Sequence, residues 1–395
     1  MEDVSLPTAL EMTPERQQIY KAVKDLCDRF DDAYWLEKDN DHAFPHEFHA
    51  EIAKAGWLGI TMPTEYGGAG LGVTEAALVM QTVANSAGVF AACSTFHINL
   101  FGPHSVVVHG TPEQKRRMLP PLISGEHKVC FGVTEPDAGL DTTNITTRAV
   151  KDGNRYIVNG QKVWTSTALE ANKILLLTRT TPRDKVAKHT DGLTLFYTDL
   201  DRNYVDVRPI DKHGRNAVDS NATFFRDLPV PEEDRIGAEG AGFKLILDSL
   251  NPERILIAAE AIGVGRRALA KATQYAKERV VFGRPIGQNQ GIQHPLAESW
   301  MALEAADLMV WRAASLYDQG KPCGAQANAA KFLGADAAFE ACDRAVRTHG
   351  GFGYAKEYHV ERYLREIMIP RIAPVSREMI MCYIAERVLG LPKSY

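Results

Sequence analysis

The stretch Cys130-Phe-Gly-Val-Thr-Glu-Pro-Asp-Ala-Gly-Leu-Asp141 decides how the rest of the chain is interpreted. A short apolar run ends there in a turn rich in Thr, Pro, Gly and Asp. Such a turn leaves backbone N–H groups and a Thr hydroxyl exposed at the end of a strand, where they can hold a flat ring with polar edges. An ordinary surface turn has the same composition. Three further segments of the chain favour a cofactor site over a plain turn.

Composition indicates a soluble globular protein with two or three domains. The chain has 395 residues, of which 45% are hydrophobic and 24% charged, with a net charge of -5. This balance gives no basic face, so we expect no nucleic-acid partner. No apolar run approaches the roughly 20 residues of a membrane helix, so we expect no membrane partner. The N-terminus lacks the pattern of a secretory or transit signal, and we expect a cytoplasmic protein.

Cysteine and histidine spacing gives no sign of disulfides or metal. The six cysteines are scattered without a C-x-x-C pair, and the twelve histidines show no ligand spacing. We therefore expect reduced thiols and no metal site.

The periodicity of the chain divides it into three blocks. Residues 1–125 show helical patterns, residues 126–235 short alternating runs, and residues 236–395 long helical patterns. Blocks of this kind predict an α+β protein, not a Rossmann fold. In the middle block Asp152-Gly153-Asn154 and Asn159-Gly160 both predict hairpin turns in a small antiparallel barrel or sandwich, with a strand at Leu193–Asp199. Asn251-Pro252-Glu253 predicts the start of a long helix, and another helix is expected from Gly324 to Thr348.

The chain resembles the acyl-CoA dehydrogenase family over essentially its whole length. The resemblance is carried by motifs in family order, namely Gly132-Val-Thr-Glu-Pro-Asp-Ala-Gly139, Lys162-Val-Trp164, Glu278-Arg-Val-Val-Phe-Gly-Arg-Pro-Ile-Gly-Gln-Asn-Gln290, Gly350-Gly-Phe-Gly-Tyr354 and Glu361-Arg-Tyr-Leu-Arg365. It implies an N-terminal helical domain (1–125), a middle antiparallel β-barrel domain (126–235) and a C-terminal four-helix bundle (236–395). It also implies FAD and a homo-oligomer, a tetramer or a dimer.

The resemblance also implies which residues hold FAD. The segments containing Phe131, Val133 and Thr134 and containing Trp164, Thr165 and Ser166 would lie along the edge and face of the isoalloxazine ring, with the second segment near N5. The diphosphate and adenosine would be held by Arg279, Phe282 and Gln290, and those of a neighbouring subunit by Arg347, Gly350 and Gly351. Ser376 completes the expected cofactor-binding set.

The position of the catalytic base departs from the commonest family pattern. Many members carry a Glu in an I-Y-E-G-T segment, but the matching residues here are Ile372-Ala-Pro-Val-Ser376, and Pro374 has neither a carboxylate nor an N–H. Isovaleryl-CoA and long-chain acyl-CoA dehydrogenases instead carry the base on the long helix, in an E-R pair. Glu253 falls on that position, and Arg254 on one that contacts CoA. Glu253 could also be only the acid of a helix start, favoured there by the helix dipole. Glu260 and Glu378 are weaker candidates.

The expected reaction is the α,β-dehydrogenation of an acyl-CoA thioester to the trans-2-enoyl-CoA. Glu253 would remove the proton, the hydride would pass to flavin N5, and an electron-transfer flavoprotein would take the electrons. His97 could select the acyl end, although a structural histidine is the commoner outcome. Leu140 replaces a frequent substrate-side Ser. The alternatives are a flavoenzyme of the same fold with other chemistry (oxidase, monooxygenase or desulfinase) and a non-catalytic flavin-retaining protein.

Overall fold

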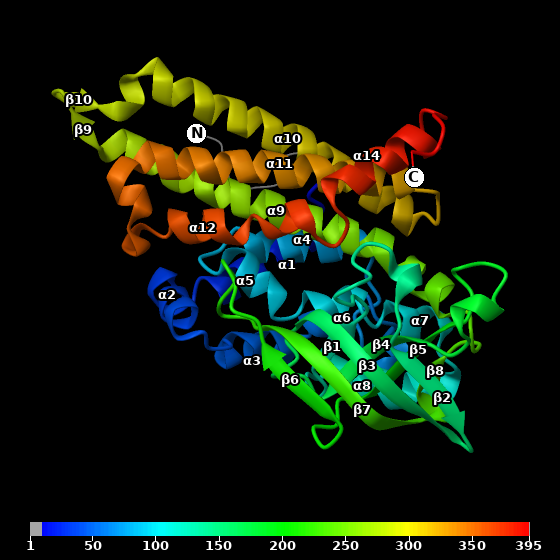
Figure 1. Cartoon of the computed structure of the whole chain (residues 1–395). Helices are drawn as coiled ribbons and strands as arrows, with labels where there is room; N and C mark the ends of the chain where they lie inside the picture. Colours follow the sequence, from blue (N-terminus) through cyan, green and yellow to red (C-terminus); the bar gives the residue numbers. More distant parts are fainter. Residues whose placement is uncertain (1–9, 395) are drawn as a thin grey trace.

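The computed structural model describes residues 10–394, and in these residues a helical part, a β part and a second helical part follow one another along the chain (Figure 1). The order agrees with the predicted blocks. The long C-terminal helices lie above the sheet in Figure 1, and the shorter N-terminal helices fill the space beside both.

The first part consists of eight α-helices that begin at clear sequence signals. Thr13 accepts a hydrogen bond from Arg16 N–H at the start of the first helix, and Thr111 forms a capping box with Gln114 at the start of the last. The helices are α1 (Pro14–Cys27), α2 (Asp32–Asp41), α3 (His46–Lys54), α4 (Val73–Ala84), α5 (Val89–Ser94), α6 (His97–Phe101), α7 (His104–His109) and α8 (Pro112–Ile123). Every residue of α4 except Glu75 is buried, because this helix packs against the C-terminal helices.

The second part is a sheet of eight strands. They are β1 (Val129–Gly132), β2 (Arg148–Asp152), β3 (Arg155–Ser166), β4 (Lys173–Arg179), β5 (Leu193–Asp199), β6 (Val205–Pro209), β7 (Ser220–Pro231) and β8 (Arg235–Ile236). Their order is β6-β7-β3-β2-β4-β5-β8, with β1 beside β4. Along β4, Ile174 and Leu176 face a small core inside the β part, whereas Leu175 and Leu177 face the main core shared with the helices. This alternation anchors the sheet to the helical parts.

Two predictions about the sheet are wrong. Asn159-Gly160 is not a hairpin turn, because both residues lie inside β3, where Gly160 has a φ of 151° at an irregularity in the pairing with β7. The pairing is also not wholly antiparallel, since β4 pairs in parallel with β1 and with β2. The turn at Gly153-Asn154 is confirmed, because β2 and β3 flank it as an antiparallel pair.

The third part is built on three long helices, α9 (Gly242–Glu278), α10 (Gln290–Asp318) and α11 (Gly324–His349). A small hairpin, β9 (Val280–Val281) and β10 (Arg284–Pro285), joins α9 to α10. Short helices α12 (Val360–Glu366), α13 (Ile369–Ile372) and α14 (Arg377–Arg387) follow. The predicted helix start at Asn251 is wrong, because α9 already begins at Gly242 and contains Pro252 in its interior. Burial of Leu245 and Ile246 explains why the helix continues through a sequence that favours a start.

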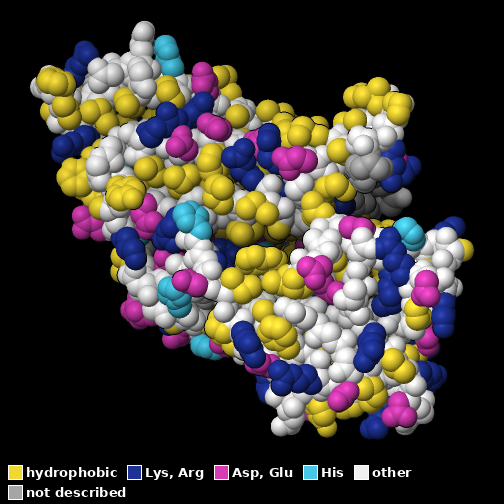
Figure 2. All heavy atoms as spheres, in the orientation of Figure 1, with side chains coloured by type: hydrophobic (Ala, Val, Ile, Leu, Met, Phe, Trp, Pro, Cys, Tyr) yellow, Lys and Arg dark blue, Asp and Glu magenta, His cyan; other side chains and the backbone are white. Residues whose placement is uncertain are grey.

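Apolar side chains are not confined to the interior. Figure 2 shows them gathered along the long helices and near the junction of these helices with the β part. On α10, Trp300, Met301 and Leu308 are 41%, 56% and 61% exposed. Among residues 10–394, no helix has the length and apolar character needed to cross a membrane.

Candidate functional site

A buried ion pair joins the turn after β1 to the middle of β3. Lys162 Nζ donates to Glu135 Oε1 and to the carbonyl oxygen of Val133, each at 2.9 Å. The Glu135 carboxylate also accepts from the N–H groups of Thr146 and Thr147, at 2.6 and 2.9 Å. Burial lowers the pKa of Lys162 to about 8. Both residues stand in the quoted motifs, but nothing in the sequence shows that they pair, and their role in fixing this turn was missed.

The two predicted ring-binding segments lie side by side at this ion pair. Val163 N–H donates to Thr134 O at 2.9 Å, so residues 131–134 and 164–166 form one surface. Within residues 10–394, the Val133 N–H and the Thr134 hydroxyl have no hydrogen-bond partner. Trp164 is 59% exposed and has a φ of 60°. A strained backbone that presents a large exposed ring beside free donors is suited to hold an aromatic cofactor ring.

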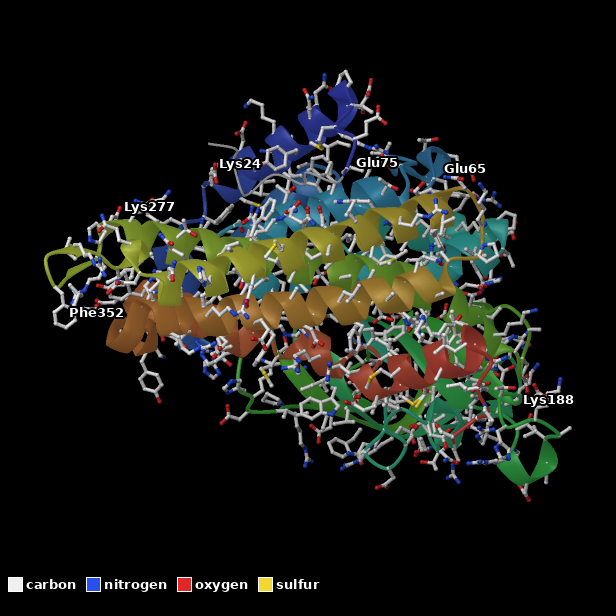
Figure 3. The ribbon with its side chains drawn as sticks, turned by 90° about the horizontal axis from the view of Figure 1, so that it is seen from above. Lys24, Glu65, Glu75, Lys188, Lys277 and Phe352 are labelled. Carbon is white, nitrogen blue, oxygen red and sulfur yellow. The ribbon has the colours of Figure 1, made fainter. Side chains whose placement is uncertain are left out.

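The predicted diphosphate and adenosine residues lie at the other end of the molecule. In Figure 3, Lys277 and Phe352 stand at one end of the long helices and Lys188 of the β part at the opposite end. Arg279 ends α9, with its guanidinium 5.4 Å from the centre of the Phe352 ring. Phe282 is fully exposed at the tip of the β9–β10 hairpin, and Gln290 is exposed at the start of α10.

The remaining residues of the expected set at this end are accessible. Arg347 pairs with Asp343 at 2.6 Å and its side chain is 67% exposed. A Cβ added to Gly350 or Gly351 would meet nothing within 4 Å, so another molecule can approach the backbone there. In Figure 1 the β9–β10 end of the long helices lies away from β1 and β3, so the described chain does not bring this end to the ring-binding surface.

Glu253 is a buried carboxyl group on α9 without a partner. It is 8% exposed, and no hydrogen bond or ion pair reaches its side chain from residues 10–394. Burial raises its pKa to about 7, against the opposite effects of Arg254 and Lys331. Because α9 begins at Gly242, Glu253 does not lie in the first turn, and the expected effect of the helix dipole does not apply. A carboxyl with this pKa can accept a proton near neutral pH.

Lys331 lies on α11, contacts the loop that contains Pro374 and acts on Glu253 through its charge. Its ammonium is wholly buried and donates to the carbonyl oxygen of Val375 at 2.6 Å. Burial and the neighbouring Arg254 lower the pKa of Lys331 to about 8, while Glu253 opposes them. Ser376 caps α14 by accepting from Met379 N–H at 3.3 Å. Sequence reasoning missed Lys331, because a lysine inside an Ala-rich helix carries no sign of the loop it contacts.

A cavity of about 230 Å³ opens beside Arg254. Arg254 Nη1 donates to Leu250 O and to Asn251 Oδ1, while its buried Nε has no partner among the described residues. The other residues that line the cavity come from α11, α14 and their flanks, namely Asn328, Val375, Met379, Tyr383, Glu386, Arg387 and Lys393. Cations therefore outnumber the single acid in this cavity, which suits a phosphorylated carrier.

The other predicted substrate residues have different surroundings. His97 Nδ1 lies 3.1 Å from both carboxylate oxygens of Glu260, and both residues are buried. Leu140 is 49% exposed. Glu260 is thus already engaged, and Glu378 is exposed, with backbone hydrogen bonding that lowers its pKa. Both are less suited than Glu253 to act as a base.

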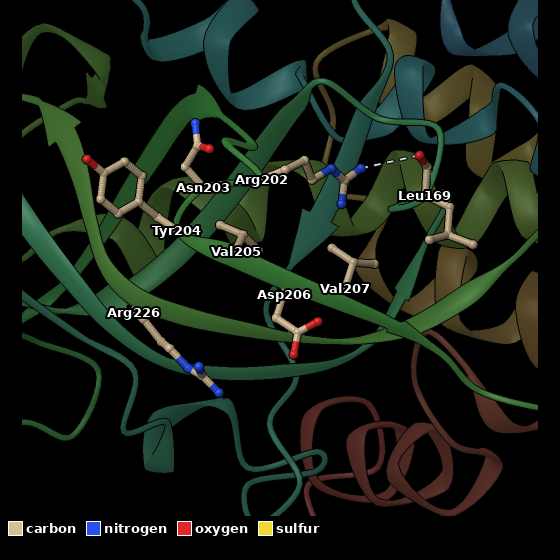
Figure 4. A pocket seen from close by; sticks show the side chains of 8 residues that line it. All are labelled: Leu169, Arg202, Asn203, Tyr204, Val205, Asp206, Val207 and Arg226. Carbon is tan, nitrogen blue, oxygen red and sulfur yellow. Dashed lines mark hydrogen bonds between the residues drawn. The ribbon is translucent and has the colours of Figure 1, made fainter.

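A larger hollow, of about 440 Å³, lies on the outside of the sheet along β6 (Figure 4). Its lining includes Leu169, Arg202 and Tyr204, and Arg202 donates to the Leu169 carbonyl. None of the predicted site residues lines it. Within residues 10–394, no group of three or more His, Cys, Asp or Glu side chains could hold a metal ion.

Comparison with known proteins identifies the family and the fold. Three family profiles match in chain order: the acyl-CoA dehydrogenase N-terminal domain over residues 13–126, the middle domain over 130–228 and the C-terminal domain over 240–389. The acyl-CoA dehydrogenase FadE12 of Mycobacterium tuberculosis is 38% identical over 98% of this chain and 99% of its own. The CarC subunit of the caffeyl-CoA reductase-Etf complex of Acetobacterium woodii is 34% identical over 84% of this chain and 87% of its own.

A solved structure agrees with these relatives. Glutaryl-coenzyme A dehydrogenase in complex with glutaryl-CoA superposes with a TM-score of 0.92 at 28% identity and covers 98% of both chains. The resemblance inferred from the motifs is thereby confirmed: the chain belongs to the acyl-CoA dehydrogenase family, an oxidoreductase family whose cofactor is FAD.

Proposed function

We propose that the chain catalyses the α,β-dehydrogenation of an acyl-CoA thioester, with Glu253 as the base. The observation that carries the proposal is the buried carboxyl group of Glu253, which has no partner among residues 10–394 and a pKa of about 7, and which directly precedes Arg254, a residue that lines the cavity. A carboxyl engaged in an ion pair would be a poor proton acceptor. Arg254 would bind the CoA part, His97 would lie at the acyl end, and Leu140 would lie on the substrate side in place of a Ser.

In the proposed reaction, the proton on Cα passes to the Glu253 carboxylate as a double bond forms between Cα and Cβ. FAD, when bound, supplies the acceptor for the hydride that leaves Cβ, at N5 of its ring. The acidity of the α-proton depends on a donor to the thioester carbonyl. Pro374 has no N–H, and we assign this role to Val375, whose N–H has no partner within residues 10–394.

We further propose that the FAD site is shared between subunits. Support comes from the β9–β10 hairpin, which follows Arg279 and has Phe282 at its tip, and which lies at the end of the long helices away from β1 and β3 (Figure 1). The exposed Trp300, Met301 and Leu308 on α10 support contact with another copy. A homotetramer or homodimer would bring the two halves of the site together. An electron-transfer flavoprotein is proposed as the electron acceptor, since the relative CarC is named as part of a complex with Etf.

We infer three domains, at 1–125, 126–235 and 236–395, with a barrel in the middle and a four-helix bundle at the end. The division is supported by the gap between α8, which ends at Ile123, and β1, which begins at Val129, and by the change from β8 to α9 between Ile236 and Gly242. The fourth bundle helix would be α14, which packs on α11.

The deciding experiment is anaerobic titration of the FAD-loaded protein with a panel of acyl-CoA thioesters, followed by flavin absorbance. The wild type should be bleached by one acyl class. Glu253→Gln should keep its flavin but bleach about 10²- to 10⁴-fold more slowly. Glu378→Gln, which alters the exposed acid near Pro374, is the matched control and should behave as wild type.

Each other result points to a named alternative. Undiminished bleaching of Glu253→Gln removes the base assignment. Oxygen consumption, or turnover without net reduction of an acceptor, favours an oxidase, monooxygenase or desulfinase. A flavin that no acyl-CoA bleaches indicates a non-catalytic flavin-retaining protein.

A further inference from the structure

Arg215 is a buried cation that no carboxylate touches. It lies between β6 and β7 and is 6% exposed. Its Nη1 donates to Ser94 Oγ at 3.1 Å, and its Nη2 to Ser166 Oγ at 3.2 Å and to Ser220 Oγ at 3.3 Å. Its Nε is buried without a partner in the described chain. Within residues 10–394, no carboxylate oxygen lies within the 4.0 Å of an ion pair.

The acids that act on Arg215 from farther away are engaged elsewhere. They are Glu366, Glu260 and Asp219. Their carboxylates already accept hydrogen bonds or pair with other groups, namely Arg362, His97 and Asn221 respectively. A buried charge is costly unless it is paired. A guanidinium held by neutral hydroxyls therefore indicates a further group, not part of this chain, on which its charge acts.

The backbone around Arg215 is built to turn this side chain inward. Arg215 has a φ of 59°, which is strained for a residue with a Cβ. A Cβ on the preceding Gly214 would lie 2.9 Å from the backbone of Arg365, so the loop is packed tightly against α12. Lys212 Nζ also donates to Arg215 O at 2.7 Å. These contacts hold the guanidinium at Ser166, on the surface formed by the two ring-binding segments.

We propose that Arg215 raises the reduction potential of the bound FAD by acting through Ser166. The inference rests on the expected position of Ser166 beside N5 of the flavin ring, and not on Glu253. Reduction increases the negative charge on the ring, and a fixed positive charge in a buried site favours the more negative form. Arg215 donates to Ser166 Oγ, and either hydroxyl can be the donor in the 3.5 Å contact between Ser166 Oγ and Ser220 Oγ. With Ser220 as that donor, the Ser166 hydroxyl proton can be donated to the ring. Arg215 thus orients the Ser166 hydroxyl and adds a positive charge near the ring without touching the ring itself.

The test is a potential measurement with an anaerobic reductant and a redox dye, without any acyl-CoA. In Arg215→Gln, the ratio of reduced to oxidised flavin at a fixed dye potential should fall at least tenfold, which is about 30 mV for a two-electron couple. Arg215→Lys keeps the charge and should stay within about threefold of wild type. The control is Arg266→Gln, which removes an equally buried guanidinium that pairs with Asp307 at 3.0 Å. It should lower the unfolding temperature without changing this ratio.

A second variant decides the matter if Arg215→Gln does not retain FAD. Ser166→Ala leaves the guanidinium in place and removes the hydroxyl between it and the ring, and its ratio should also fall, by a smaller factor. An unchanged ratio in Arg215→Gln, or in Ser166→Ala where Arg215→Gln loses the flavin, overturns the proposal. The measurement uses no acyl-CoA, so it tests the role of Arg215 whether or not Glu253 is the base.

Discussion

The buried ammonium of Lys331 donates a hydrogen bond of 2.6 Å to the carbonyl oxygen of Val375, the residue that follows Pro374. This hydrogen bond holds the loop that contains Pro374 against α11. Helix α11 in turn packs on α9, which carries Glu253. The same cation lowers the pKa of Glu253, whereas burial raises it. One lysine thus fixes the loop and keeps part of the Glu253 population ionised at neutral pH.

Replacing Lys331 with Met should move the pH dependence of catalysis. Without the cation, the pKa of Glu253 rises further, so the acid limb of kcat/KM should move above its wild-type position near pH 7. The unpaired Val375 carbonyl should also cost about 1–3 kcal/mol of stability. Lys271→Met is the control, since Lys271 pairs with Asp32 and does not act on Glu253. An acid limb that stays in place in Lys331→Met contradicts this account.

In the wild type, kcat/KM should fall as the pH is lowered through about 7, because protonated Glu253 cannot accept the α-proton. The check is a rate profile of flavin reduction between pH 5 and 9 in the FAD-loaded protein. A flat profile over this range would show that proton removal does not depend on a group with this pKa.

Stability should change with pH through the same residue. The folded chain keeps the Glu253 proton up to about pH 7, whereas an unfolded chain releases it near the ordinary value of 4.5. The unfolded chain therefore binds fewer protons in this window, and this group lowers the free energy of unfolding as pH rises from about 4.5 to 7.

Glu253→Gln should then be more stable than wild type at pH 8, by up to about 3 kcal/mol, with the difference shrinking towards pH 4. Chemical unfolding at both values of pH measures it. An equal difference in the free energy of unfolding at pH 8 and at pH 4 would contradict a raised pKa of Glu253 in the folded chain.

Breaking the ion pair between Lys162 and Glu135 should destabilise the ring-binding surface and weaken FAD retention. Lys162→Met leaves a buried carboxylate without its cation, which costs about 3–5 kcal/mol, and FAD should be released at a lower temperature. The double variant Lys162→Met/Glu135→Gln should recover part of the loss. Lys151→Met, which removes an exposed pair with Glu232, should change little. A double variant no better than the single one would argue against a role for charge pairing.

Removing the cation of Arg254 should weaken binding of the CoA part. Arg254→Gln should raise KM for the acyl-CoA about 10- to 100-fold, as expected for a lost charge-assisted hydrogen bond, with a smaller effect on kcat. Steady-state kinetics on one substrate measure both constants. Arg267→Gln is a control from the same helix, since Arg267 contacts Asp32 and does not line the cavity. A loss confined to kcat would instead give Arg254 a role in the chemical step.

Local signals in the sequence determined the block order, the family and the bounds of some elements. The strand Leu193–Asp199 was predicted with the bounds that it has, and the helix predicted from Gly324 to Thr348 ends at His349. Caps, alternation and helical periodicity act over a few residues, so they can be recognised without the rest of the chain. The motifs identified FAD for the same reason, since each is a short segment that can be recognised without the rest of the chain.

Only the tertiary structure decided what depends on residues far apart in the sequence. The Asn-Pro-Glu segment favours a helix start, yet packing carries α9 through it from Gly242. Burial raises the pKa of Glu253 to about 7, against the opposite effect of Lys331, which lies 78 residues farther along the chain on α11. Among residues 10–394, Arg215 has hydroxyl partners in place of a carboxylate, because Ser94, Ser166 and Ser220 converge on it from three elements. Desolvation and charge act through space, so no local pattern of residues records them.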